Sequence, residues 1–404
     1  MVTTTVQFFE SFFANKSSKS RKLHNAAKSV IIFDEAQMFP VKYLTPILNL
    51  LKLLVKNYGC TVLLMSATNP PFQRLLGGET EIHEIVADKT ELYNALKRVQ
   101  IEKLGDKTDD EIIKCVEAES GSTLVIVNTR RRAKTLFELY NGGSNGNAYH
   151  LSTLMTPKAR GETIGEIRGK LERGEKCAVF STQLIECGVD LDFETVYRSM
   201  AGLDSIVQAA GRCNRNGTRA VGKVKVFGAK GEAGAAKGDI ALRAGITRPI
   251  LEKSADLLSP DAIGEYFDEL FTFAGDSGLD GGRIMNMFEI RPAAGRNRLA
   301  FEFETCAANF KLIDDNSVSV IIPTDDAAKG CVAQAGKFHK RQILRKLQKY
   351  TVGIYEREAA RLLSDGALTP LGERLFVLTD LTRYDKKLGL ALEAKEMSEA
   401  IFDS

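Results

Sequence analysis

Histidine is scarce in this sequence, and no cysteines are paired in C-x-x-C spacing. Only four of the 404 residues are histidine, and none lies near another histidine or a carboxylate in metal-ligand spacing. This argues against a histidine-rich metal nuclease centre. The seven cysteines are widely spaced, which argues against a zinc ribbon and a disulfide framework and favours buried thiols in a reducing compartment.

Long apolar runs and a strong net charge are also missing. No stretch approaches the roughly 18 to 20 apolar residues that span a bilayer, and the N-terminus lacks the features of a signal peptide. We therefore expect a cytoplasmic protein. The net charge of +3 is too small to indicate a polyanion partner, so a nucleic-acid surface would require local clusters of Lys and Arg.

Short apolar runs alternate with helical stretches over the first 227 residues. Extended segments are expected at 29–33, 60–65, 122–128, 148–151, 176–181, 195–199 and 221–227. Helices are expected between them at 43–57, 130–140, 157–173 and 204–213. Continuous apolar strands separated by crossover helices predict parallel sheets covered on both faces. The sequence therefore predicts two doubly wound α/β units, with a junction in the charged stretch 97–120.

The composition changes after residue 227. GAKGEAGAAKGD (228–239) is typical of a linker, and a mixed region without recognisable chemistry follows it. There we expect helices over 239–275, a break at SGLDGG, extended stretches at LAFEFET (299–305) and SVSVIIP (317–323), and a basic helix near 336–350. Lys337, Arg341 and Arg345 would form a cationic stripe that could meet DNA phosphates, although a solvated helix face is the commoner explanation.

Two carboxylates follow the first predicted strand, in FDEAQMFP (33–40). At a strand end, Asp34 can hold Mg²⁺ and Glu35 can polarise an attacking water, and phosphoanhydride hydrolysis needs both roles. The alternative is that the acidic pair only opens a helix. The next strand ends in Ser66-Ala67-Thr68, whose hydroxyl groups can hydrogen-bond the acidic loop. This pairing favours the nucleotide-site interpretation.

A second group of candidates follows the later strands. Gln208, Arg212 and Arg215 are spaced four and three apart, so on a helix they would project from one face. That arrangement suits two guanidinium groups reaching a γ-phosphate across a domain cleft, whereas the alternative is a basic helix end. Gly188 and Asp190 would shape a loop at the cleft, with Asp190 as a partner for a ribose or an arginine finger. Strand-end residues that could hold nucleic-acid phosphates are Asn128, Thr129, Ser181 and Thr182, although strand-end turns are generally polar.

These segments resemble a known family. DEAQ, SAT, VNTRRRAK, HLST, STQLIECGVD and QAAGRCNRNG occur in the order and spacing of motifs II to VI of superfamily 2 helicases. SVIIFDEAQ, HLSTLMTPKAR and AGLDSIVQAAGRCNRNG look like the CRISPR-associated helicase–nuclease of type I interference, and most like its type I-C branch. The resemblance covers residues 1–227, and the remainder matches only by position as the family's C-terminal accessory region.

The resemblance implies RecA-like helicase lobes and an ATP-dependent motor in antiviral defence. Residues 1–96 would be the C-terminal part of an incomplete first lobe, 97–232 a complete second lobe, and 233–404 a linker and accessory domain. The family moves 3′ to 5′ along single-stranded DNA, uses ATP and Mg²⁺, cuts with a separate HD domain and is recruited by the crRNA-guided Cascade complex.

The same resemblance assigns roles to the matching residues. It makes Asp34 and Glu35 the magnesium and water residues. It assigns γ-phosphate sensing to Gln208, Arg212 and Arg215, coupling to Gln37, Ser66 and Thr68, and DNA-phosphate contacts to Asn128, Thr129, Ser181 and Thr182.

One departure from the family governs the expected activity. The sequence contains no G-x-x-x-x-G-K-[ST], so it lacks the cradle of N–H groups and the lysine that hold nucleotide phosphates. We therefore expect a split or truncated motor that is inactive until another polypeptide supplies the P-loop and the HD nuclease. Its first lobe should have an open edge and exposed apolar surface. The alternatives are a non-catalytic DNA- or Cascade-binding module and, less favoured, a fragment of an RNA helicase.

Overall fold

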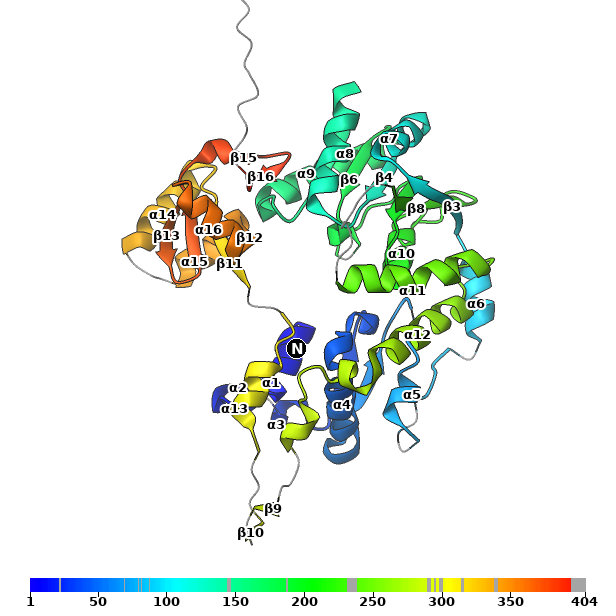
Figure 1. Ribbon diagram of the computed structural model, residues 1–404, viewed down its shortest axis with the longest axis vertical. Coiled ribbons are helices and arrows are strands. Elements are labelled where there is room, and N and C mark those ends of the chain that lie inside the picture. The colour runs from blue at the N-terminus through cyan, green and yellow to red at the C-terminus, as the bar shows by residue number, and fades with distance from the viewer. Residues whose placement is uncertain are drawn as a thin grey trace, which may run out of the picture. The chain divides into compact units, whose positions relative to one another are not determined.

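The chain forms two compact units in a computed structural model (Figure 1). The structure describes residues 1–21, 23–68, 70–78, 80, 82–86, 88–143, 147–186, 188–230, 238–288, 292–293, 296–297, 301–313, 316–337 and 341–393. The first unit comprises Met1–Lys97, Gly202–Val207 and Arg243–Asp314, and the second comprises Arg98–Ala201, Gln208–Leu242 and Asp315–Ser404. The residues after 242 are thus divided between both units. The lobe boundaries near residues 96 and 232 stay a prediction.

The second unit contains a six-stranded parallel sheet in the order β3-β8-β7-β4-β6-β5. Its strands are β3 (Val99–Lys107), β4 (Thr123–Ile126), β5 (Ala148–Leu151), β6 (Ala178–Ser181), β7 (Thr195–Ser199) and β8 (Gly222–Ala229). The helices between them include α7 (Asp109–Ala118), α8 (Arg130–Gly143) and α9 (Pro157–Glu172). Every residue of β4, β6 and β7 is buried, as expected for parallel strands covered on both faces. The predicted α/β fold is confirmed.

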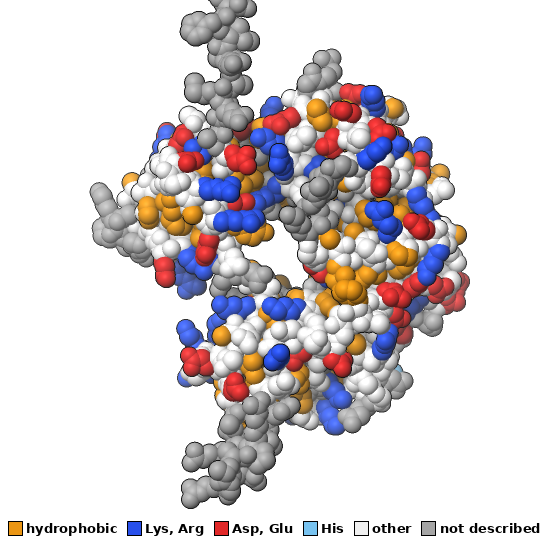
Figure 2. All heavy atoms as spheres, viewed as in Figure 1, with side chains coloured by type: hydrophobic (Ala, Val, Ile, Leu, Met, Phe, Trp, Pro, Cys, Tyr) orange, Lys and Arg blue, Asp and Glu red, His pale blue; other side chains and the backbone are white. Residues whose placement is uncertain are grey.

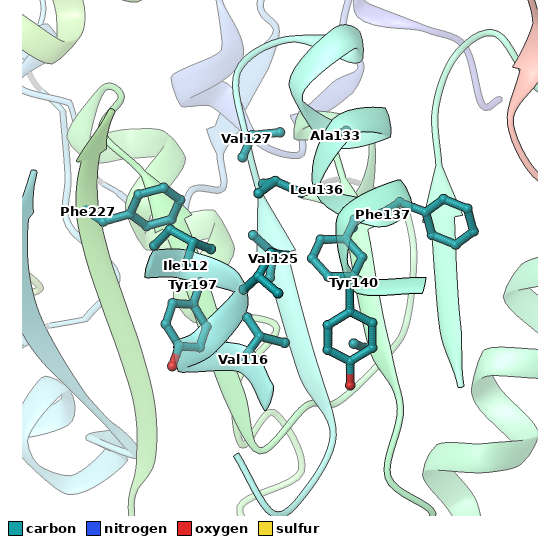
Figure 3. Packing of buried hydrophobic residues seen from close by; sticks show 13 residues of the cluster. Ile112, Val116, Val125, Val127, Ala133, Leu136, Phe137, Tyr140, Tyr197 and Phe227 are labelled. Carbon is teal, nitrogen blue, oxygen red and sulfur yellow. The ribbon is translucent and has the colours of Figure 1, made fainter. Parts of the chain in front are cut away.

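The core of this sheet is apolar and closely packed (Figure 3). Side chains from α7 and α8 meet those of the strands, with Ile112 and Leu136 fully buried against Val125 of β4. Tyr197 of β7 and Phe227 of β8 close the cluster. The apolar positions of the two helices therefore pack on the strands whose ends carry the predicted site.

The charged stretch 97–120 contains two elements that the sequence analysis missed. β3 pairs in parallel with β8 at the edge of the sheet. Most of its charged residues are exposed, so the alternation of apolar and polar residues that predicts a strand is hard to recognise in its sequence. α7 begins at a capping box in which Thr108 and Glu111 bond each other's backbone N–H groups. The T-x-x-E spacing that predicts such a cap is visible in the sequence.

The second unit also contains a smaller mixed sheet with the order β12-β11-β14-β13. Its strands are β11 (Ser317–Ile321), β12 (Thr351–Tyr355), β13 (Leu368–Gly372) and β14 (Leu375–Leu378), and its helices are α14 (Asp326–Lys337), α15 (Arg341–Leu347) and α16 (Glu356–Ser364). The predicted strand at 317–323 is confirmed. Of the predicted basic helix near 336–350, residues 341–347 form α15 and a 3-10 turn, Gln348–Tyr350, follows, while residues 338–340 lie outside the described residues. Leu347 is buried while Arg341 and Arg345 are exposed; the side chain of Lys337 lies outside the described residues.

The first unit holds a two-stranded parallel sheet of β1 (Val30–Phe33) and β2 (Thr61–Leu64). The crossover between them contains α4 (Leu44–Tyr58), and α1 (Thr5–Phe12) packs on β1 through aromatic rings. Phe9 stacks on Phe33 with centroids 5.2 Å apart, and Phe39 packs edge-on against both. This aromatic cluster covers one face of the sheet.

In the region after residue 238, one expectation is confirmed and one is wrong. The helices predicted over 239–275 are present as α11 (Asp239–Lys253) and α12 (Pro260–Leu279), and α12 continues past a kink at Gly275, where φ is 58°. Residues 303–305, predicted as extended, begin the helix α13 (Phe303–Asn309). The alternation in FEFE imitates a strand, but burial of Cys306 and the acidic first turn fit a helix.

The expectation of mostly buried thiols is confirmed for the described cysteines. All six described cysteines are free thiols, four of them buried. Burial raises the pKa of Cys177 to about 11 and that of Cys213 to about 12. Within the described ranges, no helix is long and apolar enough to cross a membrane.

A short C-terminal hairpin docks on the loop between β5 and α9. The hairpin consists of β15 (Tyr384–Asp385) and β16 (Gly389–Leu390). The Leu390 N–H donates to the Leu154 carbonyl at 2.9 Å, and the Tyr384 hydroxyl accepts from the Thr156 N–H at 3.1 Å. Gly389 has φ of 84°, and a Cβ there would lie 2.5 Å from the backbone of Leu154. Only glycine permits this approach.

Replacing this glycine should weaken the docking. We expect Gly389→Ala to lower the free energy of unfolding by about 1–3 kcal/mol, since it adds both a clash and a strained φ. Urea unfolding measures the loss. Gly353→Ala is the matched control, because its Cβ would meet nothing within 4 Å. Equal stability of the two variants would contradict the docking role of Gly389.

Candidate nucleotide site

The acidic loop after β1 has an unusual backbone conformation. Glu35 adopts φ of 56° and ψ of 47°, which is left-handed and costs energy for a residue other than glycine. Its N–H donates to Oδ1 of Asp34 at 3.1 Å. The next N–H, that of Ala36, donates to the Met65 carbonyl at 2.9 Å. The loop is thus fastened to the end of β2.

A chain of hydrogen bonds joins the DEAQ and SAT segments. Gln37 donates from Nε2 to the Glu35 carboxylate. The Ser66 hydroxyl lies 2.5 Å from Gln37 Oε1 and accepts from the Thr68 N–H at 3.1 Å. Four predicted site residues are therefore joined by hydrogen bonds, and Asp34 is adjacent to the first of them. The four are Glu35, Gln37, Ser66 and Thr68. The expectation that hydroxyls after β2 bond the acidic loop is confirmed for Ser66.

The residues of this loop fit a magnesium ion that is shared with a nucleotide. Asp34 is exposed at the end of β1, and a carboxylate is a suitable magnesium ligand. Among the described residues, no three His, Cys, Asp or Glu side chains gather in a metal-ligand cluster. Magnesium commonly uses one or two carboxylates and completes its shell with phosphates and water. Asp34 would hold the ion in that manner, and the ion would offset phosphate charge.

The second unit places the predicted arginines differently from the expectation. The helix α10 (Leu203–Ala210) ends before Arg212, so Gln208, Arg212 and Arg215 do not share one helical face. After Gly211 the chain turns, and the Phe193 N–H donates to the Arg212 carbonyl at 2.9 Å. This hydrogen bond with Phe193 is formed by residues that follow the helix. The predicted common helical face is therefore wrong, because Arg212 and Arg215 have helical spacing in the sequence but lie beyond the end of α10.

The two arginines have opposite environments. Arg212 is buried, and its guanidinium donates from Nε to the Ile185 carbonyl at 2.9 Å and from Nη2 to the Glu186 carbonyl. Arg215 is exposed, and its Nε lies 2.7 Å from Oδ1 of Asp190. The pairing agrees with the expectation of Asp190 as an arginine partner. Arg212 thus braces the backbone of the preceding loop, and Arg215 is the accessible guanidinium.

A buried ion pair organises the same strand ends and was missed in the sequence. Arg198 of β7 is 0% exposed, and its Nε lies 2.9 Å from Oε1 of Glu186. Its Nη1 donates to Asn128 Oδ1 and to the Ser199 carbonyl, both at 2.8 Å. The one signal in the sequence is an arginine inside the apolar strand TVYRS. This pair fixes the loop whose carbonyl groups hold Arg212.

The predicted phosphate-contact residues lie at the ends of β4 and β6, and the side chains of Asn128, Thr129 and Ser181 already have protein partners. Asn128 Nδ2 donates to the Met200 carbonyl at 2.8 Å, and the Thr129 hydroxyl accepts from the Arg132 N–H at the start of α8. Ser181 is fully buried, with its hydroxyl 3.0 Å from the Thr182 carbonyl. Gly188 adopts φ of 72° in the following loop. Their contacts with nucleic acid stay a prediction.

Comparison with known proteins shows which family the chain is similar to. Residues 119–218 match the family described as CRISPR-associated nuclease/helicase Cas3, C-terminal. A protein of that name from Methanothermobacter thermautotrophicus is 26% identical over 199 residues, which is 46% of this chain and 24% of the relative. The chain is related to the Cas3 helicases. The Cas3 protein of Haloferax volcanii is 25% identical over 308 residues, which is 54% of this chain and 33% of the relative.

Solved structures share the fold of this Cas3-related chain. The structure titled "Crystal structure of T. fusca Cas3-AMPPNP" superposes with a TM-score of 0.63 at 15% identity, covering 93% of this chain and 53% of that one. The structure titled "CRISPR RNA-guided surveillance complex, pre-nicking" has a TM-score of 0.58 at 13% identity, covering 94% and 59%. The chain spans between a quarter and a third of its curated relatives and about half of these structures.

Removing one partner of the buried ion pair should be costly. We expect Glu186→Leu to lower the free energy of unfolding by about 3–5 kcal/mol, because it leaves the buried Arg198 guanidinium without its counter-charge. The double variant Arg198→Met/Glu186→Leu should recover much of that loss. Urea unfolding compares them. As a control, Glu175→Gln removes a partner of the exposed pair with Arg173 and should change stability little; a similar loss there would contradict the argument.

Proposed function

We propose that this Cas3-related chain contributes half of an ATP-hydrolysing site in a motor that moves along single-stranded DNA during CRISPR interference. The observation that carries the proposal is the hydrogen-bonded group formed by Glu35, Gln37 and Ser66 at the ends of β1 and β2. Through these hydrogen bonds, the carboxylate that orients the water is connected to the segment that follows β2. The titles of related structures, which name AMPPNP, ATP and ADP, support nucleotide binding in the family.

The proposed division of roles follows from exposure and hydrogen bonding. Asp34, the exposed carboxylate, holds magnesium with the nucleotide, and Glu35 orients the attacking water. Gln37 keeps the Glu35 carboxylate in place. Arg215 stabilises charge on the γ-phosphate, because it is the exposed arginine and its partner Asp190 holds it by a single ion pair. Arg212 positions the loop and does not contact the nucleotide.

The site needs a phosphate cradle from outside these 404 residues. The sequence contains no G-x-x-x-x-G-K-[ST], and that loop supplies the N–H groups and lysine which bind the β- and γ-phosphates. We therefore propose that the chain hydrolyses ATP only together with a polypeptide that carries this loop. The HD nuclease of the family would also come from such a polypeptide.

A second candidate function rests on the same missing loop. Without a phosphate cradle, the chain would serve as a non-catalytic module that binds DNA or the Cascade complex. The similarity to a structure titled as a CRISPR RNA-guided surveillance complex favours association with Cascade under either function. On the face drawn in Figure 2, Lys and Arg side chains are interspersed with Asp and Glu, so DNA contacts would depend on local groups of cations.

ATP hydrolysis separates the two functions. We expect background activity from the chain alone with single-stranded DNA, and stimulated activity after mixing with a polypeptide that carries the P-loop and HD regions. Glu35→Gln should reduce the restored rate by roughly 100-fold or more, because the water loses its orienting base. Arg215→Ala should reduce it by roughly 1000-fold. Steady-state phosphate release measures all of these rates.

Arg173→Ala is the matched control, since Arg173 is also exposed and ion-paired in the second unit. It should leave the restored rate unchanged. Substantial hydrolysis by the chain alone would refute the requirement for an external loop. Mixing without any restored hydrolysis, but with retained DNA or Cascade binding, would favour the non-catalytic module.

The exposed arginines of α15 provide a DNA-binding prediction. Arg341→Glu/Arg345→Glu should weaken binding of single-stranded DNA and reduce the slope of log K against log salt by roughly 0.7 for each lost phosphate contact. Fluorescence anisotropy over a salt series measures both quantities. The control Arg357→Glu/Arg361→Glu makes the same charge change on exposed positions of α16. Unchanged affinity and slope would remove α15 from the DNA surface.

A further inference from the structure

A polar pocket of about 440 Å³ opens in the first unit. Three segments that are far apart in the sequence line it: the 3-10 turn Val41–Tyr43, the loop 281–283, and residues 308–311. They adjoin the helices α4, α12 and α13, respectively (Figure 1). Among the described residues, the lining of this pocket and the candidate nucleotide site have no residue in common, so the pocket is a separate feature.

Each of the three segments brings one cation to the pocket. The cations are Lys42, Arg283 and Lys311, and all three are exposed. None of the described residues that line the pocket is Asp or Glu. Asp280 precedes the loop, but its two carboxylate oxygens accept from backbone N–H groups of the following turn at 2.8 and 3.0 Å. The described lining therefore carries positive charge alone.

Hydrogen bonds join the three segments pairwise. The Gly281 N–H donates to the Lys42 carbonyl at 2.9 Å. The hydroxyl of the buried Tyr43 donates to the Asn309 carbonyl at 2.7 Å. Asn309 in turn donates from Nδ2 to the Gly282 carbonyl at 3.2 Å. Because every segment is bonded to the other two, the three cations are mounted on one connected frame.

The glycines of the loop permit this close assembly. A Cβ on Gly281 would lie 2.7 Å from Cγ of Lys42, and one on Gly282 would lie 3.2 Å from Cε1 of Tyr43. Arg283 follows with a left-handed φ of 51°, which is costly for a residue other than glycine. The sequence analysis predicted only a break at SGLDGG. In the structure, the same glycines bring the backbone against Lys42 and Tyr43.

The number and kind of the cations indicate the ligand. A phosphate group presents oxygen atoms in several directions, so cations from three segments around one pocket can each meet a different oxygen. A carboxylate is planar and is typically held by one arginine through two parallel hydrogen bonds. The three-sided arrangement of Lys42, Arg283 and Lys311 therefore favours phosphate.

We propose that the pocket formed by the Val41–Tyr43 turn, the 281–283 loop and residues 308–311 is a binding site for a phosphate group. Two sources offer this chemistry, the backbone of a nucleic-acid strand and a mononucleotide. Lys42 and Arg283 donate to the phosphate oxygens, and Lys311 adds charge. The site is independent of ATP hydrolysis at Glu35. It gives a role to a region that had no recognisable chemistry in the sequence.

Two probes test the site on the full chain in buffer without ATP and magnesium. Fluorescence anisotropy follows a labelled oligothymidylate, and isothermal titration calorimetry follows thymidine monophosphate. We expect Lys42→Gln/Arg283→Asn to weaken binding of the phosphate source roughly tenfold or more, because two charge-assisted hydrogen bonds are lost. Asparagine is chosen since it tolerates a left-handed φ. Far-UV circular dichroism verifies folding of each variant.

Two further variants separate a built pocket from diffuse charge. Lys19→Gln/Arg21→Asn makes the same charge change at exposed positions of the first unit and should bind both probes as the unchanged chain does. Gly281→Ala keeps all three charges but displaces the Lys42 side chain, so it should weaken binding also. Full binding by Gly281→Ala, or equal weakening by the Lys19/Arg21 variant, would overturn the proposal.

The probes also distinguish the sources. Binding of oligothymidylate but not of the monophosphate, lost in the Lys42/Arg283 variant with a shallower salt dependence, identifies a nucleic-acid strand. Loss of monophosphate binding in that variant identifies a mononucleotide. No binding of either probe, or equal binding by the Lys42/Arg283 variant, would overturn the site. Displacement of oligothymidylate by polyglutamate of equal charge would overturn it too, because the pocket would then prefer carboxylates.

These outcomes are separable from those of the proposed function. Glu35→Gln should bind both probes as the unchanged chain does. Restored hydrolysis without a phosphate site at Lys42 and Arg283 would leave the proposed function intact. Phosphate binding that depends on these two residues, without restored hydrolysis, would support the pocket and refute the catalytic function.

Discussion

Parallel pairing of strands is the constraint on which both halves of the candidate site depend. Because parallel strands end at the same edge of a sheet, the loops after β1 and β2 meet, and so do those after β4, β6 and β7. Polar residues at these ends become neighbours although they are far apart in the sequence. The Glu35–Gln37–Ser66 group and the Arg198–Glu186 pair are two results of the same geometry.

The second unit combines accessible and inaccessible cations. Arg198 and Arg212 are buried, and both hold the segment after β6: Arg198 forms an ion pair with Glu186, and Arg212 donates to the Ile185 carbonyl. Arg215 is exposed beside Asp190. A buried ion pair contributes little to stability compared with apolar packing, whereas it can specify one arrangement. The two buried arginines thus stabilise the segment after β6, and the exposed Arg215 pairs with Asp190 further along that segment.

The sequence predicted strands and motifs better than it predicted turns. Buried apolar strands such as β4 and β6 are evident from composition, since every position is apolar or small. The edge strand β3 was not predicted, because its charged residues are exposed to solvent and its sequence therefore lacks a continuous apolar run. The end of α10 at Ala210 also escaped, since pairing between Phe193 and residues near Cys213 depends on contacts that helical periodicity does not encode. For the site, the residue types were correct in the acidic loop. The burial of Arg212 and Ser181 could not be predicted, because exposure depends on tertiary packing.

The first unit is discontinuous, and this has a consequence for how the protein is made. Its N-terminal segment Met1–Lys97 is completed by Arg243–Asp314, while the second unit needs residues after Asp315. A ribosome must therefore synthesise more than 300 residues before either unit has all of its segments. Until then, the apolar side chains of the strands β1 and β2 are unprotected from solvent, and such nascent chains are prone to aggregate. Synthesis of this protein is expected to rely on chaperones that bind early segments and release them late.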